Sequence, residues 1–201
     1  MSLNDVTTRD VDYWESAYET GVPHWDKGQP APPLVRVIKK ARLPEGTRVL
    51  VPGCGFGHEV LFLAQAGCEV TAVDFAPSAI QRVRERARGL PITALERDIF
   101  SLSEELADRF DLVVEHTCFC AIPIEMRDAY ADVMSEVLVE KGQIIGLFYE
   151  TDNQDGPPFK TTVADVQRHF SRYFDILKVS RPKDSFENRR GKEWLITLRK
   201  R

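Results

Sequence analysis

The stretch VLVPGCGFGH at residues 49–58 decides the fold of this chain. A short apolar run ends there in three alternate glycines, Gly53, Gly55 and Gly57, and an apolar stretch of helical character follows. This pattern predicts a buried strand, a tight turn and the start of a helix, because glycine lets the backbone bend sharply and lets a ligand approach closely. A nucleotide-like cofactor is the usual occupant of such a turn in an α/β fold, although glycine-rich turns also serve as plain connectors.

Length and composition favour one globular domain over residues 1–201. The chain is 43% hydrophobic and 29% charged, which is ordinary for a globular protein. Its net charge of −4 argues against a nucleic-acid partner, and no apolar run approaches the roughly 20 residues that a membrane span requires. Residues 1–12 lack the apolar core of a signal peptide, and the four cysteines show no disulfide-framework pattern. We therefore expect a cytoplasmic protein with reduced thiols.

Strand-like and helix-like segments alternate after residue 33, which predicts an α/β fold with a doubly wound, Rossmann-like sheet. The predicted strands lie at residues 48–51, 69–73, 92–95, 110–115 and 142–149, and the predicted helices at residues 34–41, 58–66, 78–88, 126–138 and 163–170. Two further apolar runs, at residues 174–179 and 193–198, are expected to pair as a terminal hairpin. The result is a seven-stranded, mostly parallel sheet with an antiparallel edge hairpin.

Two carboxylates stand at the ends of predicted strands. Asp74 lies 17 residues beyond Gly57, which suits an acid that accepts hydrogen bonds from ribose hydroxyls; the alternative is a cap for the following helix. Asp98 is followed by Ile99 and another large apolar residue. Such a pair can bond an adenine amine and stack against its ring, or Asp98 can simply cap the next short helix.

The first 33 residues are predicted to form an aromatic lid segment. A short helix is expected at residues 11–19, and Trp14, Tyr18 and Trp25 lie within or just after it. These side chains either cover the edge of the core or close over a ligand in the glycine-rich turn.

The segment after the fourth predicted strand carries His116, Cys118 and Cys120. The spacing between the two cysteines is tight for a metal site, and the chain has no second Cys/His pair at a finger-like distance. We therefore predict no metal site, and we interpret the cysteines as small buried hydrophobic residues.

The chain resembles the class I S-adenosylmethionine-dependent methyltransferases, on its G-x-G-x-G turn and on the acids Asp74 and Asp98. A narrower resemblance is to the thiopurine S-methyltransferase family, which includes the plant halide and thiol methyltransferases. It lies in the motifs W-x-x-x-Y-x-x-G and P-x-W-D-x-G at residues 14–28, in F-C-A-I, M-R and Y-A-D-x-M at residues 119–134, and in G-P-P-F at residues 156–159.

The resemblance implies S-adenosyl-L-methionine as the cofactor, with S-adenosyl-L-homocysteine as its product, and a small thiol, thiopurine, chalcogen or halide as the methyl acceptor. The implied cofactor-binding residues are Trp14, Tyr18, Trp25, Gly53, Gly55, Gly57, Asp74, Phe75, Asp98, Ile99 and His116. The implied acceptor-binding residues are Phe119, Pro158 and Phe159. Arg127 is the implied catalytic residue, since a guanidinium can lower the pKa of a thiol or hold an anionic acceptor; a surface ion pair is the alternative.

Methyl transfer to a soft nucleophile requires little acid or base catalysis, so proximity and a dry pocket are expected to supply most of the catalysis. Two alternatives remain at this stage. One is an NAD-dependent oxidoreductase on the same fold, for which the sequence offers no convincing hydride-transfer acid or base. The other is a cofactor-binding sensor without catalysis. For the methyltransferase we expect a monomer.

Overall fold

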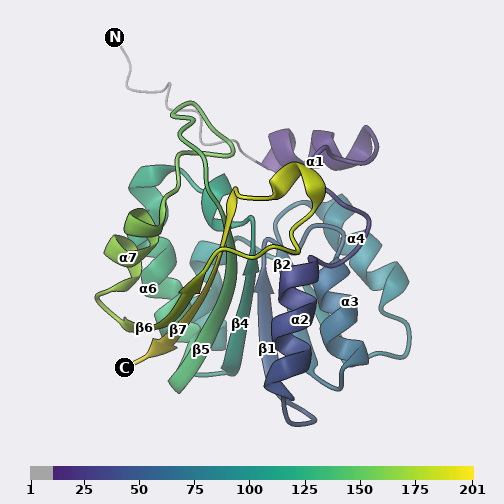
Figure 1. Cartoon of the computed structure of the whole chain (residues 1–201). Helices are drawn as coiled ribbons and strands as arrows, with labels where there is room; N and C mark the ends of the chain where they lie inside the picture. The colour runs from purple at the N-terminus through teal and green to yellow at the C-terminus, as the bar shows by residue number, and fades with distance from the viewer. Residues whose placement is uncertain (1–10) are drawn as a thin grey trace.

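The computed structural model describes residues 11–201, so the first ten residues of the predicted lid segment lie outside the described part of the chain. The strands are β1 (Arg48–Pro52), β2 (Glu69–Asp74), β3 (Ile92–Glu96), β4 (Phe110–His116), β5 (Leu138–Tyr149), β6 (Phe174–Ser180) and β7 (Glu193–Lys200). They form one sheet in the order β3-β2-β1-β4-β5-β7-β6 (Figure 1). Neighbouring strands among β1–β5 are parallel, whereas β7 lies antiparallel between β5 and β6. The predicted sheet and its terminal hairpin are confirmed.

The helices are α1 (Val11–Glu19), α2 (Pro32–Ala41), α3 (His58–Gln65), α4 (Pro77–Arg86), α5 (Leu102–Leu106), α6 (Arg127–Val137) and α7 (Val163–Phe170). Each helix predicted from the sequence is present, with its ends shifted by two residues or fewer. A short helix after Asp98 was predicted as an alternative, and it is present as η1 (Ile99–Ser101) followed by α5 (Leu102–Leu106). The 3-10 turns η2 (Phe119–Ala121), η3 (Ile124–Met126) and η4 (Glu187–Arg189) were not predicted. Such short elements have too few residues for a helical repeat of apolar positions.

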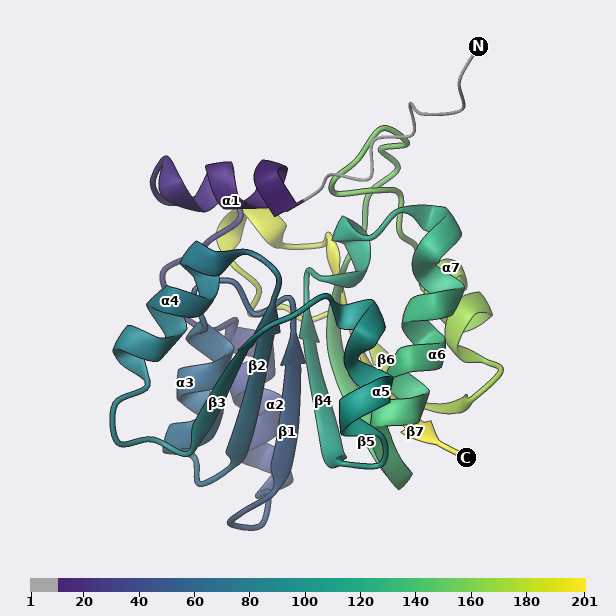
Figure 2. The same ribbon diagram turned by 180° about the vertical axis from the view of Figure 1, so that it is seen from behind.

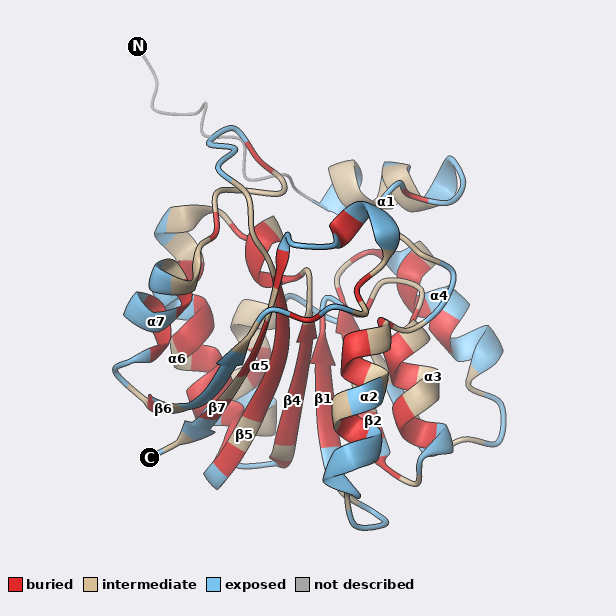
Figure 3. Ribbon diagram, in the orientation of Figure 1, coloured by how far each residue is buried: buried red, intermediate tan, exposed pale blue. Residues whose placement is uncertain are grey.

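The central strands β1 and β4 bury both of their faces, and alternate residues point to opposite sides. Along β1, Val49 and Val51 pack into the core under α2, α3 and α4, whereas Leu50 packs into the core under α5, α6 and α7. Figure 2, seen from behind, shows α5 and α6 on the face opposite to α2. Colouring by burial shows β1, β4 and β5 as an almost continuously buried centre (Figure 3). A sheet covered on both faces explains why these strands are apolar runs and not alternating patterns.

The carboxyl ends of the parallel strands share one edge of the sheet, and three segments cross that edge. They are α1, the loop after β5 and the segment that carries η4 between β6 and β7 (Figure 1). Helix α1 has no buried residue of its own, so it lies on the domain as a cover. No helix among residues 11–201 is long and apolar enough to cross a membrane.

Candidate functional site

A cavity of about 620 Å³ opens at this edge of the sheet. Its volume is typical of a site for a cofactor or a small ligand. The lining comes from the glycine turn after β1, the ends of β2 and β4, the aromatic lid, and the loops after β3, β5 and η4. The cavity therefore joins segments from the whole length of the described chain.

The floor of the cavity is the backbone of the glycine turn. Gly53 and Gly55 adopt positive φ angles of 56° and 51°. A Cβ atom on Gly53 would lie 2.9 Å from the Sγ atom of Cys118, and one on Gly55 would lie 3.2 Å from the hydroxyl of Tyr18. Both positions thus require glycine, for conformation and for space. Gly57, also left-handed, does not line the cavity; a Cβ there would lie 2.7 Å from Val83, so it serves the packing of α3 against α4.

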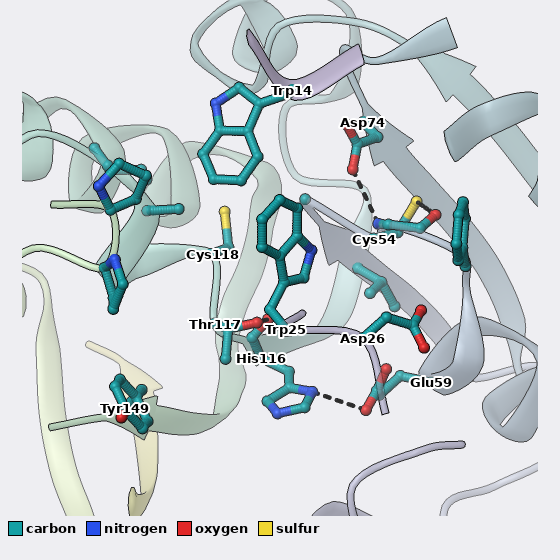
Figure 4. Close-up of a pocket in the computed structure, with 18 of the residues that line it drawn as sticks. Trp14, Trp25, Asp26, Cys54, Glu59, Asp74, His116, Thr117, Cys118 and Tyr149 are labelled. Carbon is teal, nitrogen blue, oxygen red and sulfur yellow. Dashed lines mark hydrogen bonds and ion pairs between the residues drawn. The ribbon is translucent and has the colours of Figure 1, made fainter. Parts of the chain in front are cut away.

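Asp74 lies at the end of β2 and faces the cavity (Figure 4). Its Oδ2 atom accepts a hydrogen bond from the Gly55 amide at 2.9 Å, and its Oδ1 atom accepts one from the Ala76 amide at 3.1 Å. Burial raises the pKa of this carboxyl to about 6, against the opposing effect of these amides. The residue that caps α4 is Ala76, so the alternative interpretation of Asp74 as that cap is wrong.

Asp98 caps a short helical turn and also lies at the cavity. Its Oδ1 atom accepts a hydrogen bond from the Phe100 amide at 3.0 Å and so caps η1. It also lines the cavity together with Ile99 and Phe75. These residues give one end of the cavity an acidic group beside apolar side chains, which suits a purine ring.

The lid is an aromatic cluster above the glycine turn. The rings of Trp14 and Trp25 meet edge to face with their centroids 5.3 Å apart, and Tyr18 packs against Trp25 at 6.1 Å and against Phe56 at 5.1 Å. Figure 4 shows both tryptophans at the cavity, with the sulfur of Cys118 beside them. Burial raises the pKa of the Tyr18 hydroxyl, which stays protonated at neutral pH. Of the two interpretations of these aromatic residues, the structure favours the lid.

Another wall of the cavity holds a polar cluster. His116, at the end of β4, places its Nδ1 atom 2.9 Å from Oε1 of Glu59 and its Nε2 atom 3.1 Å from Nη1 of Arg189. The second terminal nitrogen of Arg189 donates to the carbonyl of Trp25 at 2.9 Å and so connects this wall to the lid. Tyr149, from β5, lines the same wall (Figure 4).

Sequence reasoning found His116 in this cluster but not Glu59, Tyr149 or Arg189. Arg189 is part of a basic loop at residues 181–192, in which many arginines and lysines look alike. One signal was available: Glu59 is an acid in the first turn of the helix that follows the glycine turn.

Comparison with known proteins agrees with this geometry. The model of the family described as Thiopurine S-methyltransferase matches residues 9–200. The chain belongs to the thiopurine S-methyltransferase family. It is 35% identical to thiocyanate methyltransferase 1 of Brassica oleracea, over 90% of this chain and 82% of that protein. It is 27% identical to a thiopurine S-methyltransferase of Bordetella petrii, over 86% of each chain.

Solved structures with lower identity share the fold of this family member. One comes from work on the conversion of a disulfide bond into a thioacetal group during echinomycin biosynthesis. It has a TM-score of 0.79 and 23% identity, and the match covers 95% of this chain and 93% of that chain. A Burkholderia thailandensis 1,6-didemethyltoxoflavin-N1-methyltransferase, with bound S-adenosylhomocysteine, has a TM-score of 0.73 and 19% identity, and the match covers 94% and 86% of the two chains.

Family membership makes the protein an S-adenosylmethionine-dependent methyltransferase with a class I fold. The predicted resemblance and cofactor are therefore confirmed, and the alternative of an NAD-dependent oxidoreductase is dropped. The cavity itself fits the cofactor: it offers a backbone floor with glycine at positions 53 and 55, a carboxylate at the end of β2 and a second carboxylate beside apolar side chains.

The residues predicted on the acceptor side of this methyltransferase separate into two groups. Pro158 lines the cavity together with Pro157. Phe119 is fully buried and packs against the rings of Phe148 and Phe170, so it belongs to the core. Phe159 is also absent from the lining; its amide donates to the Cys120 carbonyl at 2.7 Å and fixes the loop after β5.

Arg127 does not line the cavity either, and it is not a surface ion pair. Its side chain is 1% exposed, and its guanidinium stacks 4.5 Å from the centroid of the Phe119 ring. It donates to the carbonyl of Lys160 at 2.7 Å and to the hydroxyl of Thr161 at 3.0 Å. The structure therefore makes Arg127 a support for the loop that carries the two cavity prolines, where sequence reasoning expected a catalytic residue.

The four cysteines are free and buried. Cys54 and Cys118 line the cavity, and burial raises the pKa of both thiols well above the usual value, so they stay protonated. Protonated thiols are poor nucleophiles. Within residues 11–201 there is no cluster of three or more His, Cys, Asp or Glu side chains that could hold a metal ion.

Proposed function

We propose that this protein transfers a methyl group from S-adenosyl-L-methionine to a small soft nucleophile: a thiol, a thiopurine, a related chalcogen or a halide. The observation that carries the proposal is the continuity of the cavity. One cavity joins the glycine floor and Asp74 to the polar wall at His116 and Arg189. The names of the relatives, which include thiocyanate, thiol and thiopurine methyltransferases, support this class of acceptor.

In this proposal the half of the cavity beside β1–β3 holds the cofactor. Asp74 accepts hydrogen bonds from the ribose hydroxyls, and Asp98 and Ile99 hold the adenine. The backbone at Gly53 lies against the methionine moiety, and Trp14 covers it from the lid. When bound there, the cofactor supplies an activated methyl group on a sulfonium.

The other half of the cavity is the proposed acceptor site. Apolar side chains of Ile122, Met126 and Pro158 line it together with His116 and Arg189. The apolar side chains exclude water and suit a polarizable sulfur or halide. The guanidinium favours an acceptor that is anionic or becomes so, since an opposite charge nearby stabilises the charged form.

The chain's remaining contribution is orientation. In-line attack requires the acceptor atom about 3–3.5 Å from the methyl carbon, and holding two reactants in this way supplies a large part of the barrier reduction. Arg127 contributes indirectly, because it fixes the loop that brings Pro157 and Pro158 to the cavity. The proposal includes a single domain over residues 1–201, a monomeric state and a cytoplasmic location.

The test is incubation with methyl-labelled S-adenosylmethionine and a panel of acceptors: an aromatic thiol, a thiopurine, bisulfide, thiocyanate and iodide. We expect label in a methyl sulfide, methyl thiocyanate or iodomethane, and its loss in Asp74→Ala. Asp111→Ala is the matched control, since Asp111 accepts hydrogen bonds from Arg48 far from the cavity and does not line it. Tight binding of S-adenosylhomocysteine without transfer to any acceptor would favour the non-catalytic sensor and overturn the proposal.

A further inference from the structure

His116 is held between a carboxylate and a guanidinium at the cavity wall. Its Nδ1 atom lies 2.9 Å from Glu59 Oε1, and its Nε2 atom lies 3.1 Å from Arg189 Nη1 (Figure 4 shows the first contact). A guanidinium can only donate hydrogen bonds, so Nε2 must accept and Nδ1 must carry the proton that is given to Glu59. These contacts assign a neutral imidazole whose lone pair is on Nε2.

Glu59 is well suited to hold this tautomer. Burial works to raise the pKa of its carboxyl, and the hydrogen bonds that it accepts from His116 and from the Ala31 amide work to lower it. The Ala31 amide donates to the same Oε1 atom at 2.9 Å and fixes its position. A carboxylate that orients an imidazole in this way also stabilises the imidazolium that forms when the ring takes up a proton.

The charged groups around a neutral His116 carry a net negative charge, so the cluster can accept one more proton. The groups that face or adjoin it are Glu59 from α3, Glu115 from its own strand, Tyr149 from β5, Arg189 from η4, Glu193 from β7 and Lys27 from the lid. In direct contact are two carboxylates, Glu59 and Glu193, and one guanidinium, Arg189. A neutral His116 leaves this buried group with one excess negative charge, and an imidazolium cancels it.

Glu193 adds an independent observation. Its side chain is fully buried, its Oε1 atom lies 3.9 Å from His116 Nε2, and its Oε2 atom has no hydrogen-bond partner in the described structure. A buried carboxylate oxygen without a partner costs free energy. A proton on Nε2 would bring positive charge towards this carboxylate, so the cluster is arranged to receive one.

We propose that His116 is the proton acceptor for thiol substrates and that Glu59 is its positioning residue; this rests on the proposed function. The S–H bond of the acceptor breaks, a new N–H bond forms at Nε2, and the electron pair stays on sulfur as a thiolate. Arg189 Nη1 can no longer donate to the protonated Nε2, so it is free to donate to the thiolate. The proton passes to water when the product leaves.

The proposal separates two kinds of acceptor at the same site. Thiocyanate and iodide arrive as anions without a proton, so their methylation does not depend on a base. A thiol whose pKa lies above the ambient pH arrives protonated and does depend on one. The two acceptor kinds share the cofactor, the lid and the cavity, and they differ in this one requirement.

The experiment compares the full chain with His116→Gln, using an aliphatic thiol and thiocyanate as acceptors between pH 5 and pH 9. Loss of a general base typically costs roughly 100-fold or more in rate, so we expect the thiol-to-thiocyanate ratio of kcat/KM at pH 7 to fall about 100-fold. The residual thiol activity of the variant should then rise with pH up to the pKa of the thiol itself.

The matched control is His169→Gln. His169 forms the same kind of pair, with its Nδ1 atom 2.6 Å from Asp128 Oδ1, but it is outside the cavity lining. This variant should leave the thiol-to-thiocyanate ratio unchanged. Should His116→Gln fail to fold, the native protein gives an independent readout: its pH–rate break should be the same for thiols of different pKa.

Three results would overturn the inference. Equal losses of thiol and thiocyanate activity in His116→Gln, with an unchanged pH profile, would make His116 merely structural. A pH–rate break in the native protein that follows the pKa of each thiol would show that no enzyme base is used. Methylation of thiocyanate but of no thiol would remove the role of His116 and keep the proposed function, whereas methylation of no acceptor at all would remove both.

Discussion

The two halves of the cavity are built in different ways. On the cofactor half, the hydrogen bond between the Gly55 amide and Asp74 joins residues 19 positions apart. On the acceptor half, His116 and Arg189 are 73 positions apart, and Arg189 and the carbonyl of Trp25 are 164 apart. The first half uses backbone conformation and one buried carboxylate, and the second uses side chains brought together by the whole fold. A common cofactor can thus be kept on a local motif while the acceptor wall changes.

The largest expected effect is a loss of cofactor affinity, caused by a substitution in the cofactor half alone. Asp74→Ala removes the acceptor of two backbone amides and of the proposed ribose hydroxyls. Hydrogen bonds to a charged group contribute about 1.5–3 kcal/mol each, so we expect S-adenosylhomocysteine to bind on the order of 100-fold more weakly or worse. Calorimetric titration measures this affinity, with Asp111→Ala as control. Unchanged affinity in a folded Asp74→Ala protein would contradict the ribose assignment.

The next effect concerns the support of the acceptor half. Arg127→Met leaves the carbonyl of Lys160 and the hydroxyl of Thr161 without their buried donor, so we expect unfolding to become easier by about 2–4 kcal/mol. Chemical denaturation measures this loss, and Arg109→Met, at an exposed position, should change stability by less than about 0.5 kcal/mol. S-adenosylhomocysteine affinity should stay within threefold or so of the native value. If the Arg127→Met variant is as stable as the native protein but inactive, Arg127 has the catalytic role that the sequence analysis expected.

A pH titration sharpens the assignment of Asp74. Its pKa in the free protein is raised to about 6 by burial, and ribose hydroxyls would donate to its ionised form. Cofactor binding should therefore lower this pKa, so affinity is full above roughly pH 7 and decreases as the pH falls through 6, by about tenfold at pH 5. Calorimetry across this range measures the change. Asp74→Asn should lose the dependence, and a native affinity that rises on acidification would contradict the sign.

The smallest effect compares two glycines. Gly53 and Gly89 both have positive φ angles, but a Cβ on Gly53 would meet Cys118 at 2.9 Å, whereas one on Gly89 meets nothing within 4 Å. Substitution by alanine should lower the free energy of unfolding of both variants by about 1–2 kcal/mol, because alanine is strained in the left-handed conformation. Gly53→Ala should cost roughly 1 kcal/mol more, since overpacking adds to the strain. Equal melting temperatures for the two variants would show that the turn can accommodate a Cβ atom at Gly53 without overpacking.

The difference between the local cofactor half and the long-range acceptor half also decides how much of this site could be predicted from the sequence. The strands, the glycine turn, Asp74 and Asp98 follow from apolar runs and from the rule that parallel strands end at one edge. The wall of Glu59, His116 and Arg189 does not, since its members become neighbours only after the sheet has formed.

Three residues predicted on the acceptor side lie outside the cavity for a related reason. Phe119, Arg127 and Phe159 lie in the motifs that carry the family resemblance, and all three are packing or support residues behind the cavity. A family motif contains residues that hold a loop in place as well as residues that contact the ligand. Sequence alone does not separate these roles, because a buried arginine and a cavity arginine look identical until their partners are known.

The most direct test of this account is a crystal structure with S-adenosylhomocysteine and thiocyanate. We predict the adenine beside Asp98 and Ile99, the ribose hydroxyls on Asp74, and the sulfur directed towards the wall that carries His116, with the anion next to Arg189. A ligand bound with its sulfur directed away from that wall, or an anion held elsewhere, would contradict the division of the cavity into a cofactor half and an acceptor half.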